Sequence, residues 1–153
     1  MKTKLKIAAA GALIALALPM AAQAQWWVQH PAYLHAMSNL RQAYWLIARH
    51  DDWDSPAKPE EARAVNEIRA AYQELKQAAI IDEKDIDDQP PANFPWGDHR
   101  GRLHKALDLL RDSHNQVSGE EDTPQARGLR DRAVKHIDEA GRWTDAAIRA
   151  WDF

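Results

Sequence analysis

One pair of amphipathic segments occurs twice in this chain, and this duplication limits the folds that the chain can adopt. Apolar residues recur every three or four positions in residues 33–47, 65–79, 103–117 and 129–151, a spacing typical of one face of a helix. A shift of 70 residues superposes Ala36, Met37, Leu40, Arg41 and Ile47 on Ala106, Leu107, Leu110, Arg111 and Val117. A shift of 69 superposes Ala64, Val65, Ile68 and Ala71 on Ala133, Val134, Ile137 and Ala140. Two consecutive helices therefore repeat with nearly one period.

The repeat predicts an all-α fold built from a duplicated αα-hairpin. A lone hairpin of this size leaves an apolar face exposed, so we expect two hairpins to close face to face into an up-down-up-down four-helix bundle. The first hairpin is predicted at about residues 30–81 and the second at about 98–152. Between them, residues 82–97 read "DEKDIDDQPPANFPWG", an acidic and proline-rich sequence that favours an irregular linker.

Helix boundaries are marked by residues that suit the first turn or the cap. Pro31 and Pro59 are suited to a first turn, and Asp98 and Thr123 are suited to capping the third and fourth helices, with Pro124 opening the last.

Residues 1–24 have the pattern of a secretory signal peptide. Three lysines precede the apolar run from Ile7 to Met20, and Ala22-Gln23-Ala24 is a small-x-small cleavage site. The run is shorter than the roughly 20 residues that span a bilayer, so we expect cleavage near Ala24, a mature chain from Gln25, a periplasmic or secreted location and no stable membrane anchor.

Charge and composition exclude several functions. Removing residues 1–24 removes three lysines and no acidic residue, which leaves 17 basic against 23 acidic residues and a net charge of −6. Such a chain has no general attraction to nucleic acid. The chain has no cysteine, which excludes disulfides, c-type haem attachment and thiol chemistry. No phosphate-binding loop, Gly-x-Ser-x-Gly, His-Glu-x-x-His or Glu-x-x-His pattern is present.

Four phrases, "HPAYLHAMSNLRQA", "HDDW", "GDHRGRLHKAL" and "AVKHIDEA", resemble a family of small exported all-helical bacterial proteins. Its motifs are His-Pro, Ala-Leu-x-x-Leu-Arg, Gly-His-Arg and Ile-Asp-x-Ala. The resemblance implies a helical fold and export. Since no function is assigned to the family, it implies no site residues.

Seven histidines are the reactive side chains present in number, and imidazole is a common ligand of zinc, copper, nickel and haem iron. In an up-down-up-down bundle, antiparallel pairing sets His104 beside His136 and His35 beside Glu74. If the helices of residues 33–47 and 103–117 run parallel, all four residues lie at one level of the bundle. This arrangement predicts a divalent transition-metal site. A b-type haem with Met37 as a softer axial ligand is the related possibility. His114 is expected on the core face, at the place of Tyr44 in the first repeat.

The acidic linker and the tryptophans each have two possible interpretations. The acidic linker could bind calcium, but a solvated charge run is the simpler reading, since the glycine of an EF-hand loop is missing. The tryptophans outside the core stripes either cap the bundle or form a partner-binding patch. They are Trp26, Trp27, Trp45, Trp53 and Trp96.

We therefore expect a non-enzymatic binding or accessory protein, whose partner is an envelope protein or a small apolar ligand. The alternative is a metal or haem carrier. An envelope enzyme has the least support, because no nucleophile, base and orienting group can be placed together.

Overall fold

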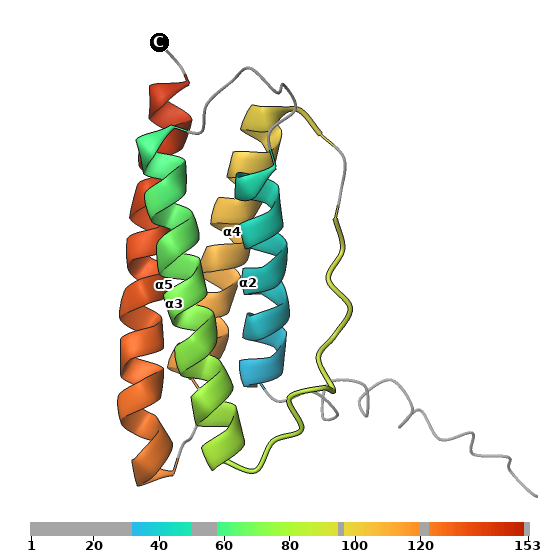
Figure 1. The fold of residues 1–153 in the computed structure, drawn as a ribbon, viewed down its shortest axis with the longest axis vertical. Helices are drawn as coiled ribbons and strands as arrows, with labels where there is room; N and C mark the ends of the chain where they lie inside the picture. The colour runs from blue at the N-terminus through green and yellow to red at the C-terminus, as the bar shows by residue number, and fades with distance from the viewer. Residues whose placement is uncertain (1–31, 50–57, 95–96, 120–122, 152–153) are drawn as a thin grey trace, which may run out of the picture.

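The computed structural model has four helices in the described part of the chain, with an irregular linker between the second and the third (Figure 1). The structure describes residues 32–49, 58–94, 97–119 and 123–151. The helices are α2 (Ala32–Ala48), α3 (Pro59–Ile81), α4 (His99–Ser118) and α5 (Pro124–Ala150). They coincide with the four predicted segments, and the predicted all-α four-helix fold is confirmed.

The starts of α3, α4 and α5 form as the local sequence predicts, whereas Pro31 lies outside the described residues. The Asp98 side chain accepts a hydrogen bond from the backbone N–H of Gly101 at 2.7 Å, and Thr123 accepts one from Ala126 at 3.3 Å. Both satisfy N–H groups that a first helical turn leaves without partners. At its other end α3 closes with a Schellman turn, in which Lys84 N–H donates to the Ala79 carbonyl and Glu83 adopts a φ of 55°.

The core is built from the repeated positions. Buried side chains of all four helices form one cluster, and most of them are Leu, Ile and Ala. Leu40 and its repeat equivalent Leu110 are both buried, as are Ile68 and Ile137. The predicted core position His114 is an exception: its side chain is 38% exposed and pairs with Asp138 on α5.

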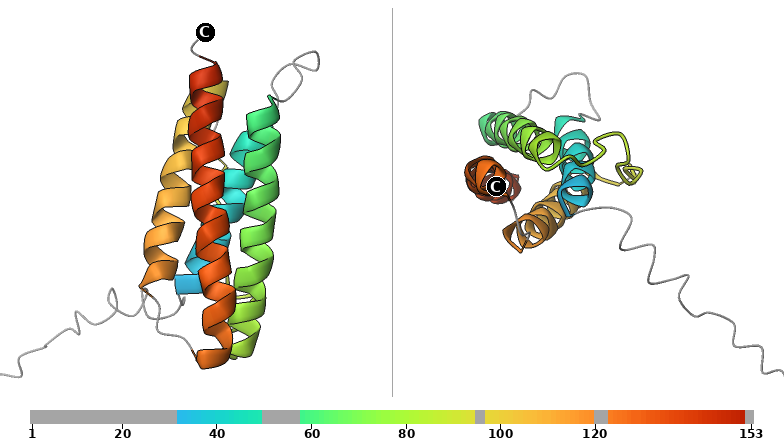
Figure 2. Two further views of the ribbon diagram at one scale, coloured as in Figure 1. Left: turned by 90° about the vertical axis from the view of Figure 1, so that its left-hand side faces the viewer. Right: turned by 90° about the horizontal axis from the view of Figure 1, so that it is seen from below.

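Each helix contacts two neighbours, in the ring α2, α3, α5, α4 (Figure 2). At one end of the bundle Arg102, in the first turn of α4, donates to the carbonyl of Leu46, near the end of α2. Farther along, the Ser113 hydroxyl, which donates to the Leu109 carbonyl of its own helix at 2.8 Å, lies 3.5 Å from the carbonyl oxygen of Ala36. Residue numbers rise in α4 while they fall in α2, so these two helices are antiparallel.

The order of directions is therefore up-down-down-up, and the predicted up-down-up-down order is corrected. The linker permits this order, because it runs from the end of α3 back along the bundle to the start of α4 (Figure 1). Residues 82–98 span up to about 55 Å when extended, at roughly 3.3 Å per residue. That is longer than α3, which measures about 35 Å at 1.5 Å per residue. A connection of this length allows the second hairpin to pack antiparallel to the first.

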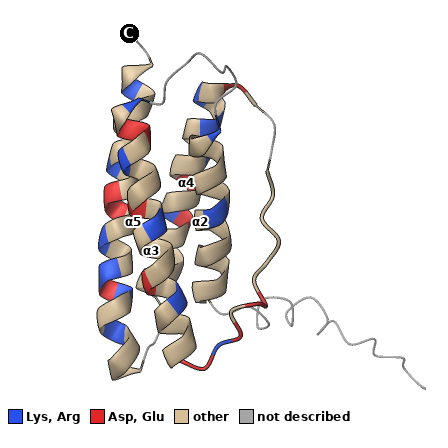
Figure 3. Cartoon of the chain, viewed as in Figure 1, with Lys and Arg blue, Asp and Glu red and all other residues tan. Residues whose placement is uncertain are grey.

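The linker is fastened to the bundle along its path. The Ser38 hydroxyl donates to the Pro90 carbonyl at 2.7 Å. Gln89 donates to the Tyr72 hydroxyl at 3.3 Å, and Ile86 is partly buried against the core. The acidic residues gather in the first half of the linker (Figure 3), where Ile86 is the side chain packed against the core.

A buried polar network ties the helices together at the end of the bundle where α4 begins. Arg102 is 2% exposed and donates to three backbone carbonyls, those of Leu46, Arg49 and Gly97. It also donates to Nδ1 of His99 at 3.1 Å, so Nε2 of His99 carries the hydrogen that faces Glu61 Oε1 at 2.9 Å.

The same carboxylate completes the network from α3. Glu61 is 1% exposed, and its Oε1 also accepts from the indole N–H of Trp151 at 2.7 Å. The ring of His99 packs against that of Trp151 with centroids 4.7 Å apart. Through these contacts α3, α4 and Trp151, the residue that follows α5, are joined, and Arg102 adds the end of α2.

None of the four described helices has a stretch long and apolar enough to cross a bilayer.

Candidate functional site

The residues predicted to bind a metal lie apart in the structure. His136 Nδ1 is 2.6 Å from Glu67 Oε2, and Glu74 is held by Arg132 through two hydrogen bonds of 2.9 and 2.8 Å. Hydrogen bonding to Glu74 raises the pKa of Arg132 above its ordinary value. His104 is exposed and His35 is partly buried. Within the described ranges, no three His, Asp or Glu side chains are placed to share a metal ion.

The register of α4 against α5 and the direction of α4 against α2 explain this separation. His114 pairs with Asp138, which places the level of His136 near His114. His104 lies ten residues earlier on α4, or about 15 Å along the helix at 1.5 Å per residue. On α2, His35 lies beside Ala36, which meets Ser113 and not the level of His104. The predicted four-residue layer of His35, Glu74, His104 and His136 is therefore not formed.

The structure also places Met37, the start of the acidic linker and one of the tryptophans outside the core stripes. Met37 is fully buried in the apolar core. In the acidic linker, Asp82 accepts a hydrogen bond from the Thr123 hydroxyl at 2.5 Å. Among the tryptophans outside the core stripes, Trp45 is partly buried against the core. Trp26, Trp27, Trp53 and Trp96 lie outside the described residues.

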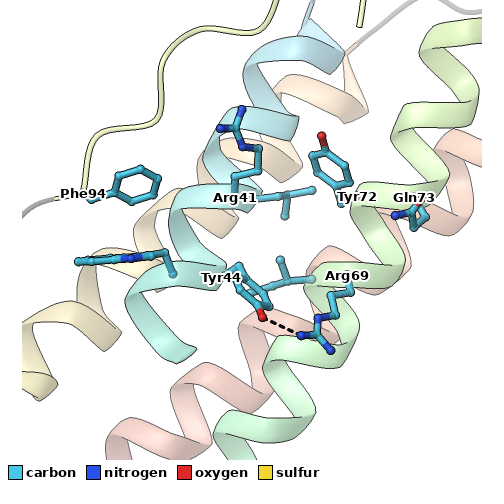
Figure 4. Close-up of a pocket in the computed structure, with 9 residues that line it drawn as sticks. Arg41, Tyr44, Arg69, Tyr72, Gln73 and Phe94 are labelled. Carbon is cyan, nitrogen blue, oxygen red and sulfur yellow. Dashed lines mark hydrogen bonds between the residues drawn. The ribbon is translucent and has the colours of Figure 1, made fainter. Parts of the chain in front are cut away.

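An aromatic pocket lies on the outer face of the first hairpin, between α2 and α3 (Figure 4). Its volume is about 280 Å³. Leu40 and Ile68, which are buried in the core, lie at its base. The nine lining residues are Leu40, Arg41, Tyr44, Trp45, Ile68, Arg69, Tyr72, Gln73 and Phe94. We call this site the aromatic pocket.

Four aromatic side chains give the pocket its shape. Tyr44 and Trp45 come from α2, Tyr72 from α3 and Phe94 from the linker. The rings of Trp45 and Phe94 lie 5.1 Å apart, centroid to centroid, at an interplanar angle of 47°. Phe94 is 40% exposed, so the linker contributes a wall that is open to solvent on one side. Such rings suit a flat apolar ligand.

The polar groups of the pocket are two hydroxyls, one amide, one indole N–H and two guanidinium groups. Arg69 donates to the Tyr44 hydroxyl at 2.6 Å, and its guanidinium lies over the Tyr44 ring at 5.0 Å (Figure 4). Arg41 makes a weak hydrogen bond to Gln89 at 3.5 Å. The lining residues include no carboxylate, so all the formal charge of the pocket is positive.

The second hairpin has a groove at the equivalent place. With the two repeat shifts, eight of the pocket residues correspond to eight residues of a groove between α4 and α5. In repeat order, the groove residues are Leu110, Arg111, His114, Asn115, Ile137, Asp138, Gly141 and Arg142. Even the interhelical hydrogen bond recurs: Arg69 with Tyr44 in the first hairpin, and Asp138 with His114 at 2.7 Å in the second. The duplication thus extends from the core to the outer face.

The two sites have nevertheless diverged in chemistry. The groove is larger, at about 590 Å³, but it has Asn115 and Gly141 where the aromatic pocket has Trp45 and Tyr72. Its charged residues pair among themselves or with neighbours on the same helix, as Arg142 does with Glu139. The groove therefore has neither aromatic walls nor an excess of one charge, and the aromatic pocket is the better ligand site.

The apolar spacing of Tyr44 and Tyr72 predicts core positions, whereas both side chains are only partly buried and line the pocket. The signal that could have found it lies in the repeat itself. Between the first repeat and the second, Trp45 is replaced by Asn115, Arg69 by Asp138 and Tyr72 by Gly141. The core positions around them stay apolar in both repeats.

Comparisons of the chain with known protein families, curated proteins and solved structures found no match. The resemblance to small exported helical proteins therefore stays a prediction.

Proposed function

We propose that this protein is a binding protein that holds a small apolar ligand in the aromatic pocket between α2 and α3. The observation that carries the proposal is the convergence of four aromatic rings over a base of Leu40 and Ile68. Three of the rings come from helices fixed by the core, so this part of the site is formed before a ligand enters.

The volume sets the size of the ligand. About 280 Å³ lies near the lower end of the range for small-molecule sites and holds a ligand of one or two fused rings. The linker wall at Phe94 is fastened through its neighbours Gln89 and Pro90, which limits how far a larger ligand could push it outward.

The proposed activity is binding without catalysis. The side chains that line the pocket include no Ser, His, Asp or Glu, and the chain has no Cys. The available polar groups are those of Tyr, Trp, Arg and Gln, which orient and hold a ligand.

Titration with 2-naphthalenemethanol, a neutral and rigid probe, tests the proposal. We expect one site with a dissociation constant of about 0.1 mM, since a 12-atom ligand of ordinary efficiency gains about 5.5 kcal/mol. Replacing Phe94 by Ala should weaken binding about fivefold, which corresponds to the loss of one aromatic contact.

Ile80→Ala is the matched control, because Ile80 is a 53% exposed apolar side chain that does not line the pocket. It should leave the affinity unchanged. The proposal fails if the protein shows no saturable binding below about 1 mM, or if Phe94→Ala and Ile80→Ala have the same effect.

We also propose that the protein acts outside the cytoplasm, in the periplasm or as a secreted protein, after removal of residues 1–24. The support is the signal-peptide pattern that ends at Ala24. The intact mass of the exported protein should correspond to a chain that begins at Gln25, with or without cyclisation of that glutamine. A periplasmic species that retains Met1 would contradict this expectation.

A further inference from the structure

We propose that the ligand of the aromatic pocket is a small aromatic monocarboxylate, whose anionic group is attracted by the positive charges of Arg41 and Arg69. This inference rests on the proposed function and specifies the chemical class of the ligand. It depends on the charge of the pocket, on how Arg69 is held and on the comparison with the equivalent groove.

Neither pocket arginine forms an ion pair with a carboxylate of the described residues. Arginines elsewhere do form such pairs: Arg132 with Glu74, Arg142 with Glu139 and Arg149 with Asp145. Two guanidinium groups without such a pair in the described residues, beside an apolar cavity, favour a ligand that carries a negative charge.

Arg69 is also held in place before a ligand arrives. Its Nη2 donates to the Tyr44 hydroxyl at 2.6 Å, and the guanidinium lies over the same ring. A guanidinium group has five N–H donors, so this single hydrogen bond leaves other donors for a carboxylate. Since Tyr44 also lines the pocket, the bond keeps the cation at the edge of the cavity.

Arg41 approaches the pocket from the opposite helix. It lies on α2, while Arg69 lies on α3, and both are labelled at the pocket in Figure 4. The hydrogen bond from Arg41 to Gln89 is 3.5 Å long and therefore weak. A carboxylate at the opening could replace it with a shorter, charge-assisted bond at small cost.

The equivalent groove shows that this positive charge is not a general property of the repeat. Arg41 has Arg111 as its counterpart, but Arg69 corresponds to Asp138, which pairs with His114. Arg111 in turn pairs with Asp108 on its own helix. Equivalent positions thus carry a cation in the aromatic pocket and an anion in the groove, so of these two sites the aromatic pocket is the one suited to a carboxylate.

Three probes of one shape test the inference: 2-naphthoate, 2-naphthalenemethanol and 2-naphthylmethylammonium, titrated by calorimetry at pH 7. We expect 2-naphthoate to bind about tenfold more tightly than the alcohol, and the ammonium probe to bind more weakly than the alcohol. The advantage of the carboxylate should shrink as salt is added, because both arginines face solvent.

The variants Arg41→Gln and Arg69→Gln identify the charges responsible. Each should weaken 2-naphthoate about threefold, the double variant should abolish the preference over the alcohol, and Arg69→Lys should retain part of it. Arg63→Gln is the matched control. Arg63 is an exposed arginine of α3 that lies over the ring of Trp143 and does not line the pocket.

The outcomes separate this inference from the proposed function. If the alcohol binds in the pocket but 2-naphthoate binds no more tightly, or keeps its advantage in the double variant, the carboxylate inference is overturned and the apolar site stands. If neither probe binds, the proposed function fails and this inference fails with it. Unchanged helicity of each variant by circular dichroism establishes that only the exposed side chain was altered.

Discussion

Arg102→Met is expected to lower the free energy of unfolding by about 3 kcal/mol, because it removes a buried charge that hydrogen-bonds to three backbone carbonyls. Methionine fills similar volume but donates nothing, so the carbonyls of Leu46, Arg49 and Gly97 lose a buried donor. The neighbouring Glu61 would also lose a nearby positive charge, because Arg102 is joined to it through His99.

Urea unfolding followed by circular dichroism measures this change. The matched control is Arg111→Met on the same helix, since the Arg111 side chain is 67% exposed and pairs only with Asp108. Surface pairs of this kind are worth less than about 1 kcal/mol. Equal stability of the two variants would show that the network at the end of the bundle does not hold the helices together.

Separating the hairpins is expected to have the largest effect on the fold. Fragments 25–90 and 91–153 should each retain about a third or less of their helicity in the intact protein, because short helices depend on tertiary packing. That packing is largely between the hairpins: α2 lies along α4, and α3 lies along α5. Mixing the fragments should restore helicity and a cooperative melt.

A control distinguishes specific pairing from simple aggregation. A second fragment with Leu110→Asp places a charge at a core position that is 1% exposed, and this fragment should fail to restore the helicity. The account of the bundle is wrong if either unmodified fragment melts cooperatively as a monomer.

The helices could be predicted from the sequence because their signals are local. Apolar spacing marked the buried faces, and Asp98 and Thr123 marked helix starts by a side chain that accepts a nearby N–H. The apolar spacing and the capping residues each involve residues within a few positions of one another, and the structure agrees with both predictions.

The direction of the second hairpin could not be predicted in this way. An apolar stripe is equally buried whether α4 runs parallel or antiparallel to α2, and the linker is long enough for either. The metal hypothesis depended in part on that choice, because the reversed second hairpin places His104 away from His35. His104 and His136 lie apart for a second reason: the His114–Asp138 pair sets a register between α4 and α5 that differs from the predicted one, and His136 pairs with Glu67.

The aromatic pocket required contacts that periodicity does not describe. Tyr44 and Tyr72 have the spacing of core residues, yet they lie at the edge of the core and are only partly buried. Phe94 reaches the pocket because Ser38 and Gln89 fasten the linker, and nothing in the local sequence of an irregular segment indicates which face it covers.

Backbone amide NMR during titration with 2-naphthalenemethanol tests the central claim most directly, because the equivalent groove serves as an internal control within the same molecule. Binding in the aromatic pocket predicts the largest shift changes in residues 40–45 and 68–73 and at Phe94, with small changes in residues 110–115 and 137–142. Largest changes in the second set, or changes spread evenly over all four helices, would contradict the assignment of the aromatic pocket as the binding site.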